Sequence, residues 1–321
     1  MQSSQDRPTV ALIGLGNIGF RHLQGLSRVG SRLNLVAVDP DQAARDRASA
    51  EWASTVGTPF ETLSDLGSLP ADTRVAIIAT SAAGRLGLLR RVLAQVAPEV
   101  VVLEKVVFQQ LRDFDEAASL AETSGAKIVV NCPRRMWPLY QSLVGIADRA
   151  AEVELSFRGR NIGLACNSVH FIDALQFLTH SATPRLVSSN LGEVFPSKRA
   201  GYFEVFGSLS FATERGRLQL RVEPDGPEAL EVTFVLDGRS YALSEAQGHV
   251  ATEAGEVLCD VGRAPFQSEL TGTLVANILE GISPALATLT DSRAAHAALF
   301  SSLELHFQRQ GVDVSLGLPI T

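Results

Sequence analysis

The residues nearest the start of the chain that could do chemistry are glycines that follow an apolar segment. Thr9 to Ile13 has the composition of a buried strand, and the spacing G-x-G-x-x-G follows it. In this pattern the first glycine permits a tight turn, the second lets the backbone approach a pyrophosphate, and the third lets a helix pack on the strand. The helix N-terminus then faces the anion. We therefore expect a dinucleotide to contact Gly14, Gly16, Asn17, Ile18 and Gly19.

An acidic residue after the next apolar segment narrows the choice of dinucleotide. Residues 33–38 are apolar, and Asp39 follows them. A carboxylate at this point accepts hydrogen bonds from the adenosine ribose and repels a 2′-phosphate, which favours NAD over NADP. The alternative interpretation is structural: Asp39, Pro40 and Asp41 form a turn and a helix N-cap.

Composition limits the classes of function. The chain has 321 residues, 45% of them hydrophobic, which is enough for two domains with separate cores. Its net charge of −7 excludes a general nucleic-acid surface, so we expect a small-molecule partner. No apolar run is long enough to cross a membrane, and the polar start Met1 to Arg7 has no signal-peptide core, so a cytoplasmic location is expected. The three cysteines, Cys132, Cys166 and Cys259, predict neither disulfides nor a metal site.

The order of predicted elements indicates how these residues are positioned. Strand and helix patterns alternate over residues 9–131, which predicts a doubly wound parallel sheet of the Rossmann type in a domain of residues 1–132. Residues 133–321 are expected to form an α+β domain with a large, open, mainly antiparallel sheet. Ligands of doubly wound sheets lie beyond the carboxyl ends of the strands. We therefore expect the cofactor-binding residues to lie together at that rim of the sheet; they are Gly14 to Gly19, Asp39, Thr80, Ser81, Glu104 and Lys105.

Lys105 is a stronger candidate for catalysis than a lysine would usually be, because lysine is rare in this chain. Of the 28 basic residues, only Lys105, Lys127 and Lys198 are lysines. Lysine loses its proton when it is desolvated, whereas arginine does not. A lysine at the rim of the sheet is therefore a candidate for catalysis; the alternative is a rim lysine paired with Glu104.

The sequence resembles the Gfo/Idh/MocA family of nicotinamide-dependent oxidoreductases over nearly its whole length. The family patterns are G-x-G-x-x-G-x-x-H, a strand ending in Thr-Pro, Glu-Lys-Pro, Asn-Arg-aromatic-x-Pro and D-x-G-x-H-x-x-D. The matching blocks in this chain are, in order, Gly14 to His22, Ala79 to Ser81, Val102 to Lys105, Asn131 to Pro138 and Cys166 to Asp173.

The resemblance implies a reaction centre. It assigns Lys105 to the substrate pocket near the nicotinamide, where an ammonium group donates to an oxygen that gains charge. It makes His170 the acid or base, because its unperturbed pKa suits chemistry near neutral pH. We expect a helix capped by Asn167 or Ser168 to carry His170, with Asp173 on the same face. The expected substrate contacts are Arg135, Trp137, Cys166, Asn167, His170 and Asp173.

Three positions depart from the family pattern. Cys166 stands where many sugar-oxidising members have aspartate, Val106 replaces the proline, and Arg85 stands where histidine is usual.

The expected activity is hydride transfer between NAD and a carbinol carbon of a sugar, cyclitol or nucleotide sugar. Two alternatives remain open: reduction of a C=N bond, and a non-catalytic NAD-bound sensor or regulatory protein.

Two further features concern partners. Arginines at the start of the second domain would suit an anionic sugar, although the chain uses arginine in nearly every basic position. They are Arg134, Arg135, Arg158 and Arg160. The resemblance also implies a homodimer or homotetramer formed through the open sheet.

Overall fold

The computed structural model describes residues 7–57 and 60–321, which form two compact units. Most of the polar start of the chain, on which the absence of a signal peptide was predicted, lies outside the described residues. The first unit comprises residues up to 108 together with 112–133 and 265–289. The second comprises residues 109–111, 134–264 and 290–321. A division after residue 132 would assign residues 265–289 to the second domain, whereas they pack in the first unit.

The first unit is a Rossmann-type fold, as expected. Its sheet has the order β15-β6-β5-β4-β1-β2-β3, and every pair is parallel except β15 with β6. The strands are β1 (Thr9–Ile13), β2 (Asn34–Val38), β3 (Glu61–Leu63), β4 (Thr73–Ile78), β5 (Val100–Leu103), β6 (Lys127–Val130) and β15 (Ala287–Thr288). β1, β4 and β5 are buried almost throughout, which explains their continuous apolar sequences.

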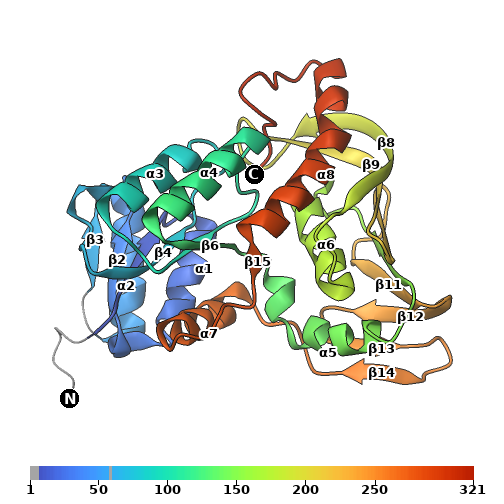
Figure 1. Cartoon of the computed structure of the whole chain (residues 1–321), viewed down its shortest axis with the longest axis horizontal. Helices are drawn as coiled ribbons and strands as arrows, with labels where there is room; N and C mark the ends of the chain where they lie inside the picture. Colours follow the sequence, from blue (N-terminus) through green and yellow to red (C-terminus); the bar gives the residue numbers. More distant parts are fainter. Residues whose placement is uncertain (1–6, 58–59) are drawn as a thin grey trace. The chain divides into compact units, whose positions relative to one another are not determined.

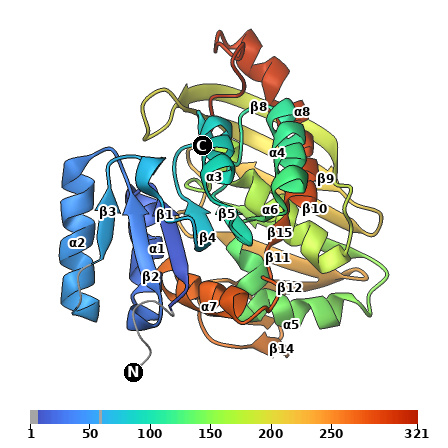
Figure 2. The same ribbon diagram turned by 60° about the vertical axis from the view of Figure 1, so that its left-hand side comes forward.

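Helices cover both faces of this sheet. They are α1 (Asn17–Leu26), α2 (Gln42–Val56), α3 (Arg85–Gln95), α4 (Leu111–Ser124) and α7 (Gln267–Leu279). α3 and α4 lie on one face and α1 and α7 on the other (Figure 1). Figure 2 shows β1, β2 and β3 side by side, with α2 next to them. α7 packs against α1, where a Cβ on Gly25 would lie 2.7 Å from Thr271 Cβ, so this late helix completes the first unit.

The second unit contains an eight-stranded sheet with the order β14-β13-β12-β11-β7-β10-β9-β8. Its strands are β7 (Val153–Arg158), β8 (Arg185–Pro196), β9 (Phe203–Ala212), β10 (Gly216–Val222), β11 (Glu231–Leu236), β12 (Arg239–Ser244), β13 (His249–Ala251) and β14 (Val257–Asp260). β7 and β10 are parallel and the other pairs antiparallel, so the prediction of a mainly antiparallel sheet is confirmed.

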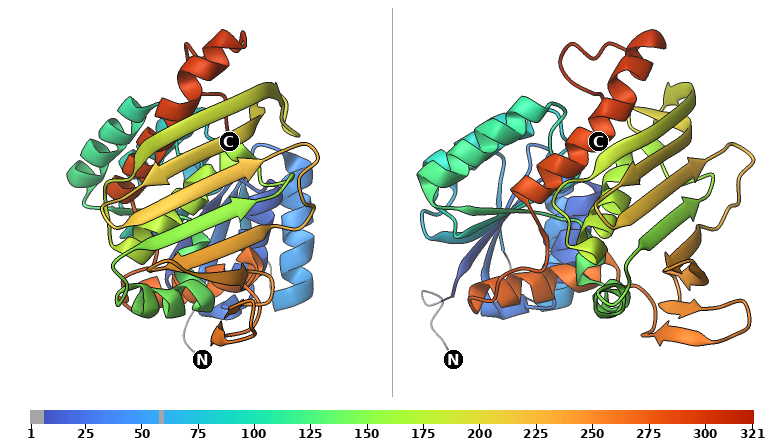
Figure 3. Two further views of the ribbon diagram at one scale, coloured as in Figure 1. Left: turned by 90° about the vertical axis from the view of Figure 1, so that its right-hand side faces the viewer. Right: turned by 45° about the vertical axis from the view of Figure 1, so that its right-hand side comes forward.

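One face of the second sheet is covered by a helix, and no helix of the described residues covers the other. The helices of this unit are α5 (Pro138–Ala147), α6 (Leu164–Thr179) and α8 (Leu289–Arg309). α6 packs on β9 and β10. Figure 3 shows the strands side by side, with α6 behind them in the left-hand view. Along β10, buried and exposed residues alternate strictly, as expected for a strand with one covered face.

Candidate active site

The glycine turn of the first unit has the geometry of a pyrophosphate cradle. Gly14 has φ +95°, which an L side chain rarely adopts, and its N–H donates to Val38 O at 2.8 Å. A Cβ on Gly16 would meet no atom within 4 Å, so the backbone is open to a ligand there. Gly16 is also the N-cap of α1, and it makes no side-chain capping bond. The first N–H groups of α1 and the open backbone at Gly16 fit a bound pyrophosphate.

Asp39 is held against this turn. Its Oδ2 accepts a hydrogen bond from Leu15 N–H at 2.6 Å, and its Oδ1 accepts one from Asp41 N–H at 2.9 Å. Asp41 accepts from Ala43 N–H at 3.1 Å and is the N-cap of α2. The capping role therefore belongs to Asp41. A carboxylate has further lone pairs, so Asp39 retains acceptor capacity for ribose hydroxyls.

Glu104 is the centre of a buried network that joins residues distant in sequence. Its Oε1 lies 2.9 Å from His22 Nε2 and 2.5 Å from Asn131 Nδ2. His22 Nδ1 lies 2.9 Å from Thr271 Oγ1 on α7. Burial tends to raise the pKa of Glu104, but hydrogen bonds from His22 and Asn131 and the charge of Lys105 hold it below its ordinary value. Glu104 is therefore an ionised anchor beside the half-buried Lys105.

The strand ends of the first unit place Thr80 and Ser81 after β4, and Glu104 and Lys105 after β5. β4 and β5 are adjacent and parallel, with Ile78 opposite Leu103. Because β1, β4 and β5 are parallel, the ends of β4 and β5 and the glycine turn after β1 lie at one edge of the sheet. The peptide bond between Lys105 and Val106 is cis.

The helix that carries His170 starts differently from the expectation. α6 begins at Leu164, and its N-cap is Gly163 with φ +74°, without a side-chain capping bond. The predicted cap at Asn167 or Ser168 is therefore wrong, because both residues lie inside the helix. Asn167 Nδ2 donates back to Ile162 O at 2.6 Å.

A carboxylate from another strand satisfies the start of α6. Glu204 on β9 is only 8% exposed, and it accepts hydrogen bonds from Ala165 N–H at 2.8 Å and Cys166 N–H at 3.2 Å. This places negative charge at the positive end of the helix dipole. The sequence reasoning missed Glu204; the only signal was an acidic residue in an otherwise apolar and small-residue strand.

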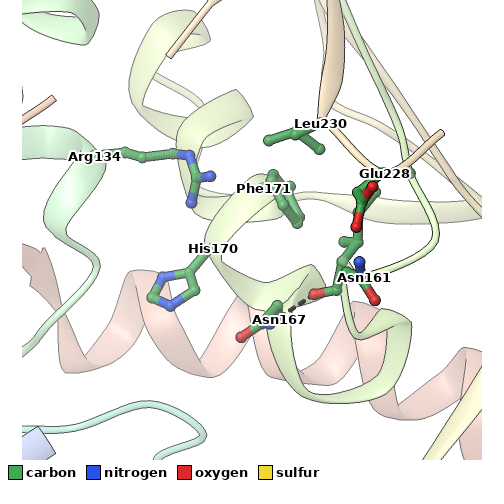
Figure 4. A pocket seen from close by; sticks show the side chains of 9 residues that line it. Arg134, Asn161, Asn167, His170, Phe171, Glu228 and Leu230 are labelled. Atoms are coloured by element: carbon green, nitrogen blue, oxygen red, sulfur yellow. Dashed lines mark hydrogen bonds between the residues drawn. The ribbon is translucent and has the colours of Figure 1, made fainter. Parts of the chain in front are cut away.

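A pocket of about 300 Å³ adjoins His170 in the second unit. It is lined by Arg134, Gly159, Asn161, Ile162, Asn167, His170, Phe171, Glu228 and Leu230. Figure 4 shows the Arg134 guanidinium and the His170 imidazole on one side of the pocket, with Asn161 and Glu228 on the other. Of the expected substrate contacts, Asn167 and His170 lie here. The pocket offers amide, imidazole and guanidinium groups beside an apolar wall.

The other expected contacts have different surroundings. Arg135 Nη2 lies 2.8 Å from Asp173 Oδ1, and its Nη1 lies 3.7 Å from Asp291. Burial raises the pKa of Asp173, and the charge of Arg135 opposes that rise. The Trp137 ring packs 5.1 Å from the Arg134 guanidinium. The Cys166 thiol lies 4.0 Å from Gly163 O.

Arg134, which was expected only as one of four arginines suited to an anionic sugar, lines the pocket. Its Nε and Nη2 donate to the two carboxylate oxygens of Glu245 at 2.6 and 2.8 Å, and Tyr140 also donates to Glu245 at 2.6 Å. The guanidinium lies 4.5 Å from the centre of the Phe171 ring. A paired, stacked guanidinium is a rigid donor rather than an unbalanced positive charge.

All four arginines that suggested an anionic ligand are paired with carboxylates. Besides the pairs of Arg134 and Arg135, Arg158 lies 3.6 Å from Glu223 and 3.4 Å from Glu231, and Arg160 lies 3.0 Å from Glu228. Their positive charge is thus balanced locally.

Over residues 7–57 and 60–321, no group of three or more His, Cys, Asp or Glu side chains gathers as a metal-binding set. No helix in that part of the chain has the length and apolar character needed to cross a membrane.

Comparisons with known proteins agree with this geometry. Residues 9–132 match the model of a family described as "Oxidoreductase family, NAD-binding Rossmann fold", the Gfo/Idh/MocA family. A comparison with curated protein sequences gives no match.

Similar solved structures extend over both units. GenD2 from gentamicin A biosynthesis, in complex with NAD, has a TM-score of 0.70 and 18% identity, covering 93% of each chain. The UDP-N-acetylglucosamine 3-dehydrogenase GnnA from Acidithiobacillus ferrooxidans has a TM-score of 0.69 and 15% identity, covering 92% of this chain and 97% of its own. A putative myo-inositol dehydrogenase from Sinorhizobium meliloti 1021 has a TM-score of 0.65 and 17% identity, covering 94% of this chain and 98% of its own. At these identities the likeness shows the fold. The family match identifies residues 9–132 as an NAD-binding domain of the Gfo/Idh/MocA family of oxidoreductases.

Proposed function

We propose that this protein transfers a hydride between NAD and a carbinol carbon of a neutral, polyhydroxylated substrate such as a sugar or cyclitol. The observation that carries the proposal is the pocket beside His170, whose lining combines amide and imidazole groups with an apolar wall. Polar groups at fixed positions and apolar walls are typical of small-molecule sites. Its volume of about 300 Å³ is at the lower end of the range for such sites, which favours a single ring over a nucleotide sugar.

The charges around this pocket support a neutral substrate over an acidic one. The buried Arg134 already has a bidentate carboxylate partner in Glu245. Glu228 lines the pocket and lies 3.0 Å from Arg160. An acidic sugar would therefore enter a site whose guanidinium groups are balanced. Hydroxyl groups would find both donors and acceptors in Asn161, Asn167 and His170.

Lys105 and His170 are the proposed proton-handling residues. Oxidation of a carbinol removes a hydride from carbon and a proton from the hydroxyl group, and reduction returns both. His170 exchanges that proton as acid or base. Lys105 donates a hydrogen bond to the reacting oxygen, where charge develops. Bound NAD supplies the chemistry of hydride acceptance and donation.

The proposal of NAD rather than NADP depends on Asp39. Its carboxylate is fixed at the glycine turn by Leu15 N–H, at the end of β2. A carboxylate at this point accepts hydrogen bonds from ribose hydroxyls and repels a 2′-phosphate.

The other proposed residues of the substrate region are Arg135, Trp137, Cys166 and Asp173, and Asp173 acts through its ion pair with Arg135.

The assembly is proposed from the family resemblance, and the location is proposed from the sequence expectation given above. A homodimer or homotetramer through the open face of the second sheet is expected, with a small molecule as the partner and the cytoplasm as the location.

The test is nicotinamide fluorescence with NAD or NADH over a panel of neutral sugars, cyclitols, acidic sugars and nucleotide sugars. The proposal expects redox turnover with a neutral polyol or its ketone, and greater activity with NAD than with NADP. Turnover restricted to acidic sugars or nucleotide sugars would contradict the substrate class. Turnover only with imines would indicate C=N reduction. Ligand binding without any redox change over the whole panel would favour a sensor.

A further inference from the structure

Arg85 and Val106 are the two departures from the family pattern that fall in the first unit, and Arg85 is buried. It is the first residue of α3, and only 1% of its surface is exposed. Its Nη1 donates to Glu104 O at 2.6 Å and to Val107 O at 2.7 Å, and also to Val106 O. Its Nη2 donates to Thr80 O. One guanidinium therefore contacts four backbone carbonyl groups.

The four carbonyl groups belong to the two strand ends that flank the proposed reaction centre. Thr80 follows β4, and Glu104 follows β5, the neighbouring parallel strand. Glu104 and Val106 are the residues immediately before and after Lys105. Hydrogen bonds from a charged donor are about twice as strong as those between neutral groups. Arg85 thus holds the backbone on both sides of Lys105 and ties it to the adjacent strand end.

This arrangement connects two sequence departures that are independent along the chain. A proline at position 106 would fix φ of that residue through its ring, and Val106 has no such ring. The guanidinium of Arg85 donates to the carbonyl group of Val106 itself. The constraint on the segment after Lys105 therefore comes from the side chain of another element.

Glu104 is held at two points, through its side chain and through its main-chain carbonyl group. The Glu104 carboxylate is engaged by His22 and Asn131, so its side chain is fixed on one side of the backbone. The Glu104 carbonyl group is engaged by Arg85. Lys105 follows a residue whose side chain and main chain are both held, and its ammonium position depends on that anchoring.

We propose that Arg85 is a positioning residue that fixes the Lys105 segment, and through it the ammonium group of Lys105. This inference rests on the proposed role of Lys105 in the reaction. Arg85 itself touches no reacting atom. Its effect on turnover acts through the geometry of Lys105.

The chain offers a direct readout, because it contains only three lysines, Lys105, Lys127 and Lys198. Protein grown with [ε-¹³C]lysine gives one NMR signal for each, assigned by Lys→Arg variants. The variants are Arg85→Met and Arg85→Lys, with Arg90→Met as the control on the same helix. Arg90 is exposed and pairs with Glu116. Arg85→Met and Arg85→Lys are expected to shift or broaden the Lys105 signal and leave Lys127 and Lys198 unchanged; Arg85→Lys also adds a fourth signal from its new lysine, which is identified by its absence from the native spectrum. Arg90→Met leaves all three native signals unchanged.

Activity and rescue complete the test. With a substrate from the panel above, Arg85→Met is expected to lower kcat by about 10²-fold, with KM changed much less. Guanidinium ion added to Arg85→Ala is expected to restore both the Lys105 signal and part of kcat. If Arg85→Met does not fold, Arg85→Lys and the rescued Arg85→Ala make the same comparison.

The outcomes separate this inference from the proposed function. An unchanged Lys105 signal in a folded Arg85 variant overturns the positioning role. Equal movement of all three lysine signals, without rescue, shows a general structural role and also overturns it. Full turnover by Lys105→Ala contradicts the proposed function instead, while a selective change of the Lys105 signal would still report the anchoring by Arg85.

Discussion

Gly19 packs so closely on Gly14 that a Cβ on Gly19 would lie 1.8 Å from the carbonyl oxygen of Gly14. Gly19→Ala therefore forces α1 away from the turn. Overpacking of this kind costs about 1–3 kcal/mol of unfolding free energy, and NAD affinity should fall with it. Chemical denaturation and NAD titration measure the two effects.

Gly16→Ala should separate binding from stability. A Cβ there meets no atom of the protein within 4 Å, so the fold is expected to keep its unfolding midpoint. The methyl group would occupy the space over the turn, and we expect Kd for NAD to rise about tenfold or more, or about 1.4 kcal/mol. Gly87→Ala on α3 is the matched control, since a Cβ there also meets nothing within 4 Å. Unchanged NAD affinity in Gly16→Ala would contradict the assignment of the cradle.

Asp39→Asn tests cofactor choice. The substitution removes the charge that repels a 2′-phosphate and keeps the side-chain size, so the preference for NAD over NADP is expected to fall about tenfold. Asp41→Asn is the control, because asparagine is also a good N-cap and Asp41 caps α2. Isothermal titration with both cofactors gives the ratio. A ratio that stays the same in Asp39→Asn would remove the argument for NAD.

The buried pair of Arg134 and Glu245 should be important for stability. The two side chains are 9% and 10% exposed, so Glu245→Gln leaves a buried guanidinium without its counter-charge. Breaking a buried pair on one side costs about 3–5 kcal/mol. Arg158→Met, which breaks exposed pairs, is expected to change the unfolding free energy by less than about 1 kcal/mol. Equal effects of the two variants in urea denaturation would argue against this account of Arg134.

The pH dependence of the unfolding free energy should show the stabilising contribution of ionised Glu104. Its pKa in the folded protein lies below the ordinary value of 4.5, although burial alone would raise it, because His22 and Asn131 donate to it. Its contribution is therefore fully present above about pH 4.5 and is lost as the pH falls through the folded pKa. The stability difference between the native protein and Glu104→Gln should shrink as the pH falls below that value. A difference that is constant from pH 7 to pH 3 would contradict this prediction.

The local parts of the fold and site follow from sequence patterns. The G-x-G-x-x-G spacing, the apolar segments before Gly14 and Asp39, and the alternation along β10 each reflect interactions within a few residues or a single sheet face. Parallel topology then brings the ends of β1, β4 and β5 to one edge. These features required no knowledge of side-chain contacts.

The long-range parts could not be predicted in this way. Glu204 meets the start of α6 from a strand about forty residues later, so no local pattern predicts the contact. The predicted cap at Asn167 failed because Gly163 adopts a left-handed conformation and the helix begins earlier. Arg134 and Arg135 are adjacent in sequence, but only the folded chain assigns one to the pocket and the other to Asp173.

Lys105→Ala addresses the proposed chemistry without disturbing the cradle. Loss of a positioned donor to the reacting oxygen is expected to lower kcat by about 10²–10³-fold, while Kd for NAD stays unchanged, because the pyrophosphate and ribose contacts are elsewhere. His170→Ala should give a comparable loss of turnover. Lys127→Ala is the control lysine, and it should retain full activity. Near-normal turnover of Lys105→Ala would end the role assigned to Lys105.

Transfer of deuterium tests the central claim most directly. A polyol substrate labelled with deuterium at its carbinol carbon is incubated with the protein and NAD, and the recovered NADH is analysed by mass spectrometry. The proposed reaction predicts NADH that carries one substrate-derived deuterium, at a rate that collapses in Lys105→Ala. If the protein binds NAD and the polyol but the recovered cofactor stays oxidised and unlabelled, the protein is not the oxidoreductase of neutral polyols proposed for it.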